Sequence, residues 1–421
     1  MRKSLLITIP LVALGAMVLG IPQFTDSASA DNDGRIRDKY VVVLKDGVEP
    51  EGNAERHGRE DGIAAEHIYR DAVNGYSFRG SAKQAAALAK DPNVKFVAQD
   101  REVHAIAQTL PTGVQRIGAN VSSTLAGNGS GSVNVGVAIV DTGIQTNHPD
   151  LNVVGGKSCV GGSYSDGHGH GTHVAGTVGA RDNGSGVVGV APGTPLYAVR
   201  VLDSSGSGSY SSIVCGLNWV AANAATIKVV NMSLGGGGAD DGNCGNSNGD
   251  IMHMAVCNLV SKGVTVVVAA GNSNIDMASF VPAAYDEVLT VTAIADFNGA
   301  PGGGASPTCR TDVDDTSADF SNWTTAASAD EAHTIAAPGA CIRSTWRGSS
   351  YATISGTSMA SPHVAGTVAL CLASGKCTGT PAQIRAKIRS DAAARATSTP
   401  GYGFTPEGGH SYGKLVYAGG Y

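Results

Sequence analysis

Three glycine-rich blocks of this 421-residue chain contain an acid, an imidazole and a hydroxyl. Asp141 opens the sequence DTG, His170 opens HGTHVAG, and Ser358 lies in GTSMASPH. These groups together are able to catalyse nucleophilic acyl transfer, in which the imidazole takes the hydroxyl proton and the carboxylate fixes the imidazole tautomer. Asn272, in the sequence VVAAGN, adds an amide that would donate to the developing oxyanion. The blocks therefore predict a hydrolase with a covalent intermediate on Ser358.

The histidines of the second block also allow a different site. His168, His170 and His173 could form a cluster of zinc ligands, which would make the protein a zinc hydrolase. Only a glycine separates His168 from His170, however, and no glutamate follows either residue as in the HExxH pattern of zinc proteases. We therefore expect His173, one turn after His170, to make a structural hydrogen bond, and His363 to do the same.

Apolar, β-branched runs alternate with helical segments along the part of the chain that contains these blocks. Continuously apolar strands separated by helices indicate a parallel sheet that is covered on both faces. We expect an α/β fold, a mostly parallel sheet with helices on both faces, whose site lies where the strands end. The expected strands are residues 133–140, 227–232, 264–270 and 288–293, and the expected helices are residues 171–180, 211–225, 250–262 and 359–373.

The blocks, in the chain order Asp, His, Ser, resemble the signatures of the subtilisin family (subtilases). This order differs from that of the chymotrypsin and α/β-hydrolase families. The resemblance runs from about residue 107 to the end of the chain and implies a secreted serine endopeptidase. It implies that Asp141, His170 and Ser358 form the catalytic triad and that Asn272 is the oxyanion donor. A catalytically inactive member of the family that serves as a surface binding module is the alternative, although such a module has no reason to keep all four residues.

The resemblance also implies how proteins and peptides bind as substrates. An extended substrate would pair with the backbone on both sides of a cleft, a form of β-augmentation. The residues implied are Ser233, Leu234 and Gly235 on one side and Gly206, Ser207 and Gly208 on the other. Tyr210 would lie near a more distal pocket, or would be an ordinary exposed tyrosine. The glycine run 235–238 lacks the lysine and hydroxyl residue of a phosphate loop.

The first 30 residues form a distinct segment. Arg2 and Lys3 precede an apolar run over residues 5–21, and Ala28 and Ala30 form a small-x-small cleavage pattern. This is typical of a secretory signal peptide, so we expect an extracellular protein. The alternative is an uncleaved membrane anchor, because the run is near the minimum length for crossing a bilayer.

Residues 31–106 contain no cysteine and many charged side chains. Strands at residues 40–44 and 94–97 and a helix at residues 81–90 would make a small α+β module. The module resembles the inhibitory prodomain of the family, which implies an intramolecular inhibitor, a self-processing zymogen and a cut near Ile106–Ala107. Residues 107–421 would then be the catalytic domain.

Charge and cysteine content restrict the partners and the compartment. A net charge of −6 and the lack of a basic stretch argue against nucleic acid as a binding partner. We also expect a monomer. All eight cysteines lie after residue 150, and an even number in an exported chain indicates four disulfides. We expect the local pairs Cys371–Cys377 and Cys244–Cys257 and the longer pairs Cys309–Cys341 and Cys159–Cys215. Spacing alone leaves many other pairings open.

A glycine-spaced loop at residues 181–187 suggests a structural calcium ion, which binds six to eight oxygens at about 2.3–2.6 Å. The alternative is an ordinary solvated turn. Because the glutamine of the family's tight site is next to the maturation cut, we expect calcium binding to depend on cleavage. The resemblance implies side-chain ligands from Gln108, Asp150 and Asn183 and carbonyl ligands from Arg181, Ser185 and Val187.

Overall fold

The structure is a computed structural model that describes residues 35–101 and 108–421. The chain divides into two compact units, Met1–His104 and Ala105–Tyr421, and each is described by itself. The expected signal peptide and the expected cut at Ile106–Ala107 lie outside the described residues. Within the described part of the chain, no helix has both the length and the apolar character that are needed to cross a bilayer.

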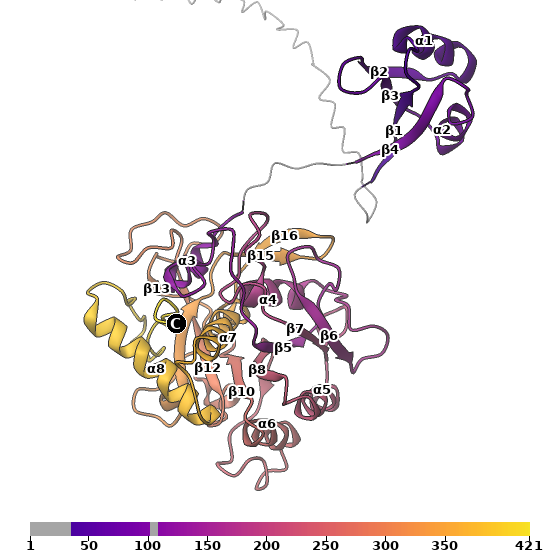
Figure 1. The fold of residues 1–421 in the computed structure, drawn as a ribbon. Helices are drawn as coiled ribbons and strands as arrows, with labels where there is room; N and C mark the ends of the chain where they lie inside the picture. The colour runs from indigo at the N-terminus through magenta and orange to yellow at the C-terminus, as the bar shows by residue number, and fades with distance from the viewer. Residues whose placement is uncertain (1–34, 102–107) are drawn as a thin grey trace, which may run out of the picture. The chain divides into compact units, whose positions relative to one another are not determined.

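The amino-terminal unit is an antiparallel sheet of order β2-β3-β1-β4 with two helices (Figure 1). Its core contains Val42, Leu44, Tyr76, Phe78 and Leu88, so the helices bury their apolar side chains against the sheet. The elements are β1 (Arg35–Leu44), α1 (Pro50–Asp61), β2 (Ala64–Tyr69), β3 (Gly75–Arg79), α2 (Ala82–Leu88) and β4 (Val94–Arg101). Sequence reasoning missed α1, β2 and β3, because α1 is almost entirely polar and β2 is mostly exposed.

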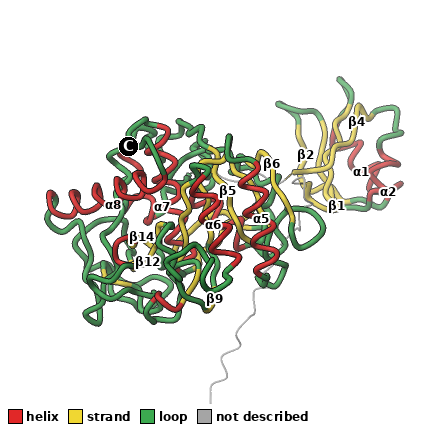
Figure 2. Tube along the Cα trace, turned by 90° about the horizontal axis from the view of Figure 1, so that it is seen from below, coloured by secondary structure: helices red, strands yellow, loops and turns green. Residues whose placement is uncertain are grey.

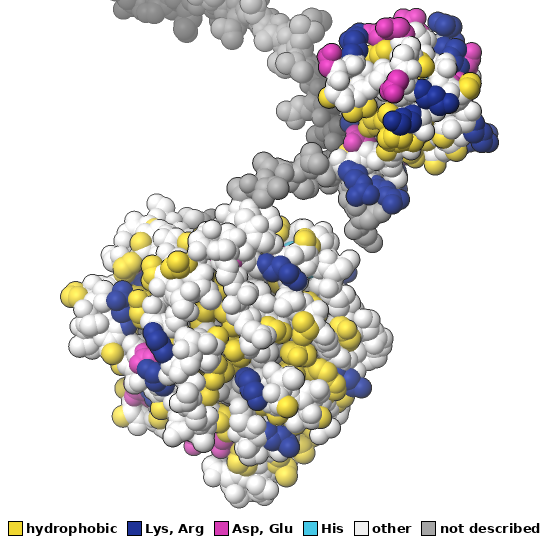
Figure 3. Space-filling view, in the orientation of Figure 1, with side chains coloured by type: hydrophobic (Ala, Val, Ile, Leu, Met, Phe, Trp, Pro, Cys, Tyr) yellow, Lys and Arg dark blue, Asp and Glu magenta, His cyan; other side chains and the backbone are white. Residues whose placement is uncertain are grey.

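Figure 3 shows that charged side chains crowd the visible surface of the amino-terminal unit. They are sparse on the face of the carboxy-terminal unit that the view presents. This difference follows the charge distribution along the sequence and supports the division of the chain near residue 105.

The carboxy-terminal unit is built on an eight-stranded sheet of order β13-β12-β10-β8-β5-β7-β6, with β14 also paired to β12. All of its strand pairs are parallel except β12 with β13. The expected α/β fold is therefore confirmed. The strands are β5 (Gly136–Asp141), β6 (Val153–Ser158), β7 (Leu196–Arg200), β8 (Ile227–Met232), β10 (Thr265–Ala269), β12 (Leu289–Ala295), β13 (Thr316–Ser317) and β14 (Thr334–Pro338).

Helices cover both faces of this sheet, as Figures 1 and 2 show. Successive side chains of a strand point to opposite faces, and β5 illustrates this. Val137 and Ile139 belong to the core that α4, α7 and α8 complete, whereas Ala138 and Val140 belong to the core of α5 and α6. The helices are α3 (Thr112–Arg116), α4 (His170–Gly179), α5 (Tyr210–Ala222), α6 (Ile251–Ser261), α7 (Thr357–Ala373) and α8 (Pro381–Ser398).

Short elements and disulfides complete the unit. Two small antiparallel pairs join β9 (Gly236–Gly237) to β11 (Phe280–Val281) and β15 (Ile342–Trp346) to β16 (Ser350–Ile354). The structure confirms the four expected disulfides, which are Cys159–Cys215, Cys244–Cys257, Cys309–Cys341 and Cys371–Cys377.

A buried arginine connects the start of this unit to its end. The Arg116 side chain, at the end of α3, is fully buried and donates to Asp315 Oδ1 and to the carbonyl oxygens of Tyr402 and Gly403. Its Nε lies 3.1 Å from Oδ2 of Asp296, which follows β12. Burial raises the pKa of Asp296 to about 7, although the Arg116 charge opposes this shift.

Removal of this guanidinium should strongly destabilise the fold. Arg116→Ala leaves the Asp296 and Asp315 carboxyl groups buried without their cation, which should lower the free energy of unfolding by about 3–5 kcal/mol. Lys387→Ala is the matched control, because it breaks an exposed ion pair with Asp391 and should cost about 0.5 kcal/mol or less. Urea unfolding followed by circular dichroism measures both, and equal midpoints for the two variants would contradict the expected role of Arg116.

Candidate active site

An acid and an imidazole meet where β5 ends and α4 begins. Asp141 is the last residue of β5, and its side chain is 0% exposed. His170, the first residue of α4, is bonded through Nδ1 to the Asp141 carboxylate at 2.8 Å from Oδ1 and 3.0 Å from Oδ2. A Cβ on Gly171 would lie 2.1 Å from the Gly143 carbonyl oxygen. Only glycine therefore lets α4 begin so close to the strand end.

The electrostatics of this pair favour a proton on His170. Burial alone lowers the pKa of His170, but the charge of Asp141 and its hydrogen bond outweigh burial and raise the pKa above its usual value. The His170 side chain remains 22% exposed. Its Nδ1 is therefore fixed by the buried acid while the side chain still reaches solvent.

The hydroxyl and the amide lie next to each other at the start of α7. Ser358 is the second residue of α7, and its Oγ donates to the carbonyl oxygen of Ser233 over 3.3 Å. Asn272 follows β10, and its Oδ1 accepts from the backbone N–H and the hydroxyl of Thr357 at 2.8 and 2.9 Å. These contacts fix the amide orientation and leave Asn272 Nδ2 without an acceptor among residues 35–101 and 108–421.

The predicted substrate-binding residues line one groove with His170. The groove has a volume of about 580 Å³, and His168, Tyr210 and Met252 also contribute to its wall. Tyr210 is 38% exposed. All six predicted residues are present in the lining: Gly206, Ser207 and Gly208 on one segment and Ser233, Leu234 and Gly235 on the other.

Comparison with models of protein families gives two matches. Residues 132–405 match the model described as the subtilase family, which covers more than half of the chain. This chain belongs to the subtilase family. Residues 39–105 match the model described as peptidase inhibitor I9.

Individual relatives of this subtilase are matched over most of their length. M-protease of Shouchella clausii is 37% identical over 372 residues, which are 86% of this chain and 87% of that protein. Subtilisin E of Bacillus subtilis is 37% identical over 374 residues, which are 87% and 88% of the two chains. A solved structure described as a cold adapted subtilisin-like serine proteinase is 32% identical, with a TM-score of 0.56, and the match covers 75% of this chain and 99% of that one. The subtilase is accordingly a serine endopeptidase with an inhibitor-type prodomain, the organisation of a zymogen.

The other histidines of the subtilase blocks are buried and neutral. His173 Nε2 lies 3.0 Å from the Ile342 carbonyl oxygen and 3.2 Å from that of Ala352, and burial lowers the pKa of His173 to about 3. Nδ1 of His363 donates to the Met359 carbonyl oxygen, and burial lowers the pKa of His363 to about 4. Among the described residues, no group with the spacing of metal ligands contains His168, His170 or His173. The structure therefore gives no support to a zinc hydrolase.

The structure also brings together the residues predicted to bind calcium. The Gln108 amide lies among the carbonyl oxygens of Arg181, Ser185 and Val187, with Nε2 at 2.7, 3.2 and 3.2 Å from them. Asn183 Nδ2 donates to Asp150 Oδ1 at 3.2 Å. The Gln108 amide already lies at this loop in the uncut chain, so the expected link of calcium binding to cleavage or to a local rearrangement near residue 106 stays a prediction.

The oxygens of this loop fit a cation. Gln108 Oε1 is buried without a hydrogen-bond partner in the described part of the chain. Rotation of the amide by half a turn would place Oε1 beside three carbonyl oxygens, an arrangement that a cation stabilises. Gly186, with φ +63°, lets the loop close on Asp150, because a Cβ there would lie 2.1 Å from Asp150 Oδ2. Carbonyl, amide and carboxylate oxygens together are a donor set that suits calcium.

Two polar residues that position the site escaped sequence reasoning. Asp166 accepts from the backbone N–H groups of His168, Gly169 and Thr172. Its carboxylate therefore provides acceptors for N–H groups at the amino-terminal end of α4. An aspartate just before a helix is a recognisable signal. Asn322 holds the loop around Asn272: its Nδ2 donates to Ala270, and its Oδ1 accepts from Ser273 and Ile275. No local sequence signal links Asn322 to a loop so far away in the chain.

Proposed function

We propose that this subtilase is a secreted endopeptidase that hydrolyses peptide bonds through an acyl-enzyme on Ser358 and matures by cleaving itself. The observation that carries the proposal is the bond between His170 Nδ1 and the buried Asp141 carboxylate, at the same edge of the sheet as Ser358 and Asn272. A parallel sheet places the carboxyl ends of β5, β8 and β10 together, and these ends lead to Asp141, Ser233 and Asn272. His170 is bonded to Asp141, and α7 is bonded to Ser233 and Asn272 at its start, so the three sequence blocks can act on one substrate.

These positions support the following reaction, for which Ser358 Oγ must turn toward His170 from the Ser233 carbonyl oxygen, its acceptor in this structure. Ser358 Oγ attacks the scissile carbonyl carbon while His170 Nε2 takes the hydroxyl proton, and Asp141 stabilises the imidazolium through Nδ1–H. The oxyanion accepts hydrogen bonds from Asn272 Nδ2 and from the backbone N–H of Ser358, at the positive end of the α7 dipole. His170 then protonates the leaving amine, and a water activated by His170 hydrolyses the ester in the second half of the reaction.

Substrate binding uses main-chain atoms on both sides of the groove. The segments 206–208 and 233–235 contain glycine, serine and a single leucine, so they offer backbone N–H and C=O groups with little side-chain obstruction. A peptide in extended conformation would add a strand between them. Affinity would then come from the substrate backbone, which suits an endopeptidase that acts on many unfolded proteins.

Secretion and maturation complete the proposal. Residues 1–30 would act as a signal peptide, residues 31–106 as an intramolecular inhibitor, and residues 107–421 as the monomeric catalytic domain. The I9 match and the cysteine-free, charged amino-terminal unit support the inhibitor role. Four disulfides in the carboxy-terminal unit support an oxidising compartment.

Replacement of the proposed nucleophile tests the function. Ser358→Ala should abolish peptide hydrolysis, with a loss of about 10⁶-fold in turnover, and should leave the zymogen uncut. Ser390→Ala, which changes an α8 serine outside the site, should keep both activities. Turnover of a peptide substrate and mass spectrometry of the secreted product measure the two effects, and a Ser358→Ala enzyme with ordinary turnover would refute the mechanism.

The raised pKa of His170 predicts a pH dependence. Only neutral His170 can accept the serine proton, so the acid limb of kcat/KM should have its midpoint above the usual histidine value of 6.5. Asp141→Asn removes the charge that raises this pKa while burial still lowers it. The limb should therefore move to lower pH as turnover falls by about 10⁴-fold. His173 and His363 titrate at about 3 and 4, outside this range, and a limb that Asp141→Asn leaves in place would argue against His170 as the base.

Calcium would serve this enzyme as a structural cation. Gln108, Asp150 and Asn183 would hold it through side chains and Arg181, Ser185 and Val187 through carbonyl oxygens. A cation that binds only the folded form stabilises by mass action, by about 2.7 kcal/mol at a concentration of 100 Kd.

Chelation should shorten the heat-inactivation half-life of the mature enzyme severalfold. Asp150→Asn keeps acceptors for Val187 N–H and the Tyr351 hydroxyl but removes the negative charge, so its half-life should be short with or without calcium. Asp203→Asn, at an exposed carboxylate outside the loop, should behave as the parent. Equal half-lives of the parent enzyme in calcium and in chelator would exclude the site.

A further inference from the structure

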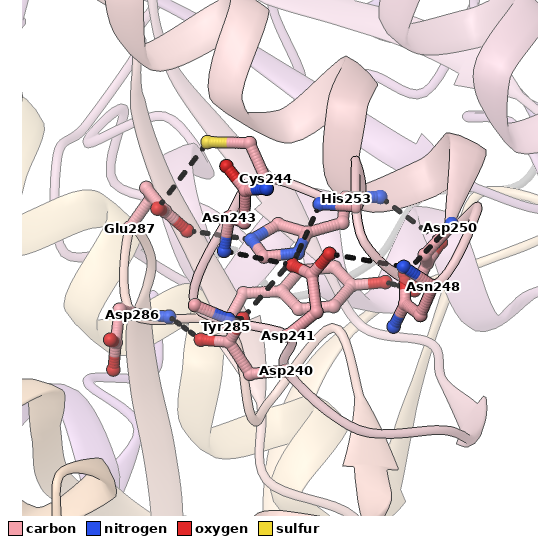
Figure 4. A network of polar contacts seen from close by, with 12 residues as sticks. Asp240, Asp241, Asn243, Cys244, Asn248, Asp250, His253, Tyr285, Asp286 and Glu287 are labelled. Carbon is pink, nitrogen blue, oxygen red and sulfur yellow. Dashed lines mark hydrogen bonds and ion pairs between the residues drawn. The ribbon is translucent and has the colours of Figure 1, made fainter.

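A second polar cluster lies outside the catalytic site, around His253 of α6. Figure 4 shows the carboxylates of Asp240, Asp241 and Glu287 gathered about the His253 imidazole. Asp240 and Asp241 belong to the loop between β9 and α6, and Glu287 lies between β11 and β12. Neither the proposed mechanism nor the proposed calcium site uses any of these residues.

The His253 ring is held rigidly. Its side chain is 0% exposed and stacks on Tyr285, with ring centroids 4.0 Å apart and an angle of 4° between the planes. Nε2 lies 2.9 Å from Glu287 Oε2, and since the carboxylate can only accept, Nε2 carries the proton. In the neutral imidazole, Nδ1 therefore has an unshared electron pair.

That electron pair faces two anionic oxygens. Nδ1 lies 3.3 Å from Asp241 Oδ1 and 3.5 Å from Asp240 Oδ1, and it has no hydrogen-bond partner among the described residues. No lysine or arginine in residues 35–101 and 108–421 forms an ion pair with either aspartate. The Nδ1 lone pair and the two carboxylate oxygens thus face one another, and their electrostatic repulsion is unfavourable unless a cation lies between them.

Backbone N–H groups hold the two carboxylates in this arrangement. Asp240 accepts from Gly242 at 2.8 Å and from Asp286 at 3.1 Å. Asp241 accepts from the backbone of Asn243 and Gly245 through Oδ1 and of Ser247 through Oδ2. Both carboxylates are therefore positioned before any cation arrives.

We propose that His253 Nδ1, Asp240 Oδ1 and Asp241 Oδ1 bind a divalent transition metal of the zinc type. Tetrahedral zinc has bonds of about 2.0–2.1 Å to nitrogen and oxygen, which places its ligands about 3.3 Å apart. The observed separations of 3.3 and 3.5 Å from Nδ1 match this spacing. Water would complete the coordination, because the Asp240 side chain is 17% exposed and opens a path from solvent.

The surroundings of the three ligands fit a metal centre. Histidine ligands usually donate their second ring N–H to a carboxylate, and Glu287 accepts that bond here. Cys244 and Cys257 are also close, but their sulfurs are joined in a disulfide and are not ligands. The metal would tie the loop that follows β9 to α6. Because Gly236 of β9 and Met252 of α6 line the substrate groove, the metal would stiffen the groove wall.

Zinc titration of the full-length chain tests the proposal. The Ser358→Ala form prevents self-digestion, and saturating calcium keeps hard-cation sites filled. Calorimetry should detect one equivalent of Zn²⁺ that Asp240→Asn and His253→Gln each abolish. Glu287→Gln should weaken this binding by about 10–100-fold. Cobalt(II) should occupy the same site and show the visible absorption of tetrahedral coordination.

Asp330→Asn is the matched control, because Asp330 also lies beside a buried histidine, but at 3.7 Å from His333 Nε2. It should leave zinc binding unchanged. Asp240→Asn keeps one of its two acceptor oxygens, so circular dichroism should show a folded protein even if His253→Gln does not fold. No bound zinc in the parent, or the same stoichiometry and affinity in folded Asp240→Asn, would overturn the proposal.

Discussion

Helix α7 must bury almost all of its surface while it presents one hydroxyl at its amino-terminal end. It has no charged side chain and packs against β8, β10, β12, β14 and α4. Most of its buried polar side chains are hydrogen-bonded. Ser361 bonds to Asn231 and Ser233 of the neighbouring β8 segment, and His363 bonds through Nδ1 to a carbonyl of its own helix. The position of Ser358 is therefore fixed by the packing of the whole core.

The same packing explains why the groups around Ser358 depend on one another. The carbonyl that accepts from Ser358 belongs to Ser233, whose own hydroxyl donates to the Ser358 carbonyl at 2.9 Å. Asn272 is bonded to Thr357, and the loop that carries Asn272 is fastened by Asn322. A displacement of α7 would therefore move the proposed nucleophile, the proposed oxyanion donor and one wall of the groove together.

Sequence reasoning predicted the parts of this enzyme whose signal is local. Continuous apolar runs made the strands at residues 227–232 and 264–270 predictable, because such runs are typical of a sheet that is buried on both faces. The helix at residues 359–373 was also predicted. The residues of the three blocks could be named from their motifs, and the disulfide pairs were correctly anticipated.

The remainder depends on contacts between distant segments. Asn322 is a polar residue outside any motif. It holds the loop around Asn272 through hydrogen bonds to three backbone groups, which only the fold brings close to it. The same is true of His253, because the carboxylates that surround it belong to two separate loops. Helix α8 was missed because its mixture of alanine and charged residues shows little periodicity, and only a few of its apolar side chains, such as Ile384 and Ile388, are buried in the core.

The distribution of disulfides has a consequence for the resistance of the protein to proteolysis. Every cross-link lies beyond residue 150, and the unit that matches an inhibitor has none. Cross-links restrict the unfolded chain and so reduce the transient openings through which a protease gains access. If the proposed maturation separates the two units, they should therefore differ in their resistance to proteolysis. The proposed inhibitor should be digested readily, whereas the cross-linked enzyme should resist digestion by its own activity.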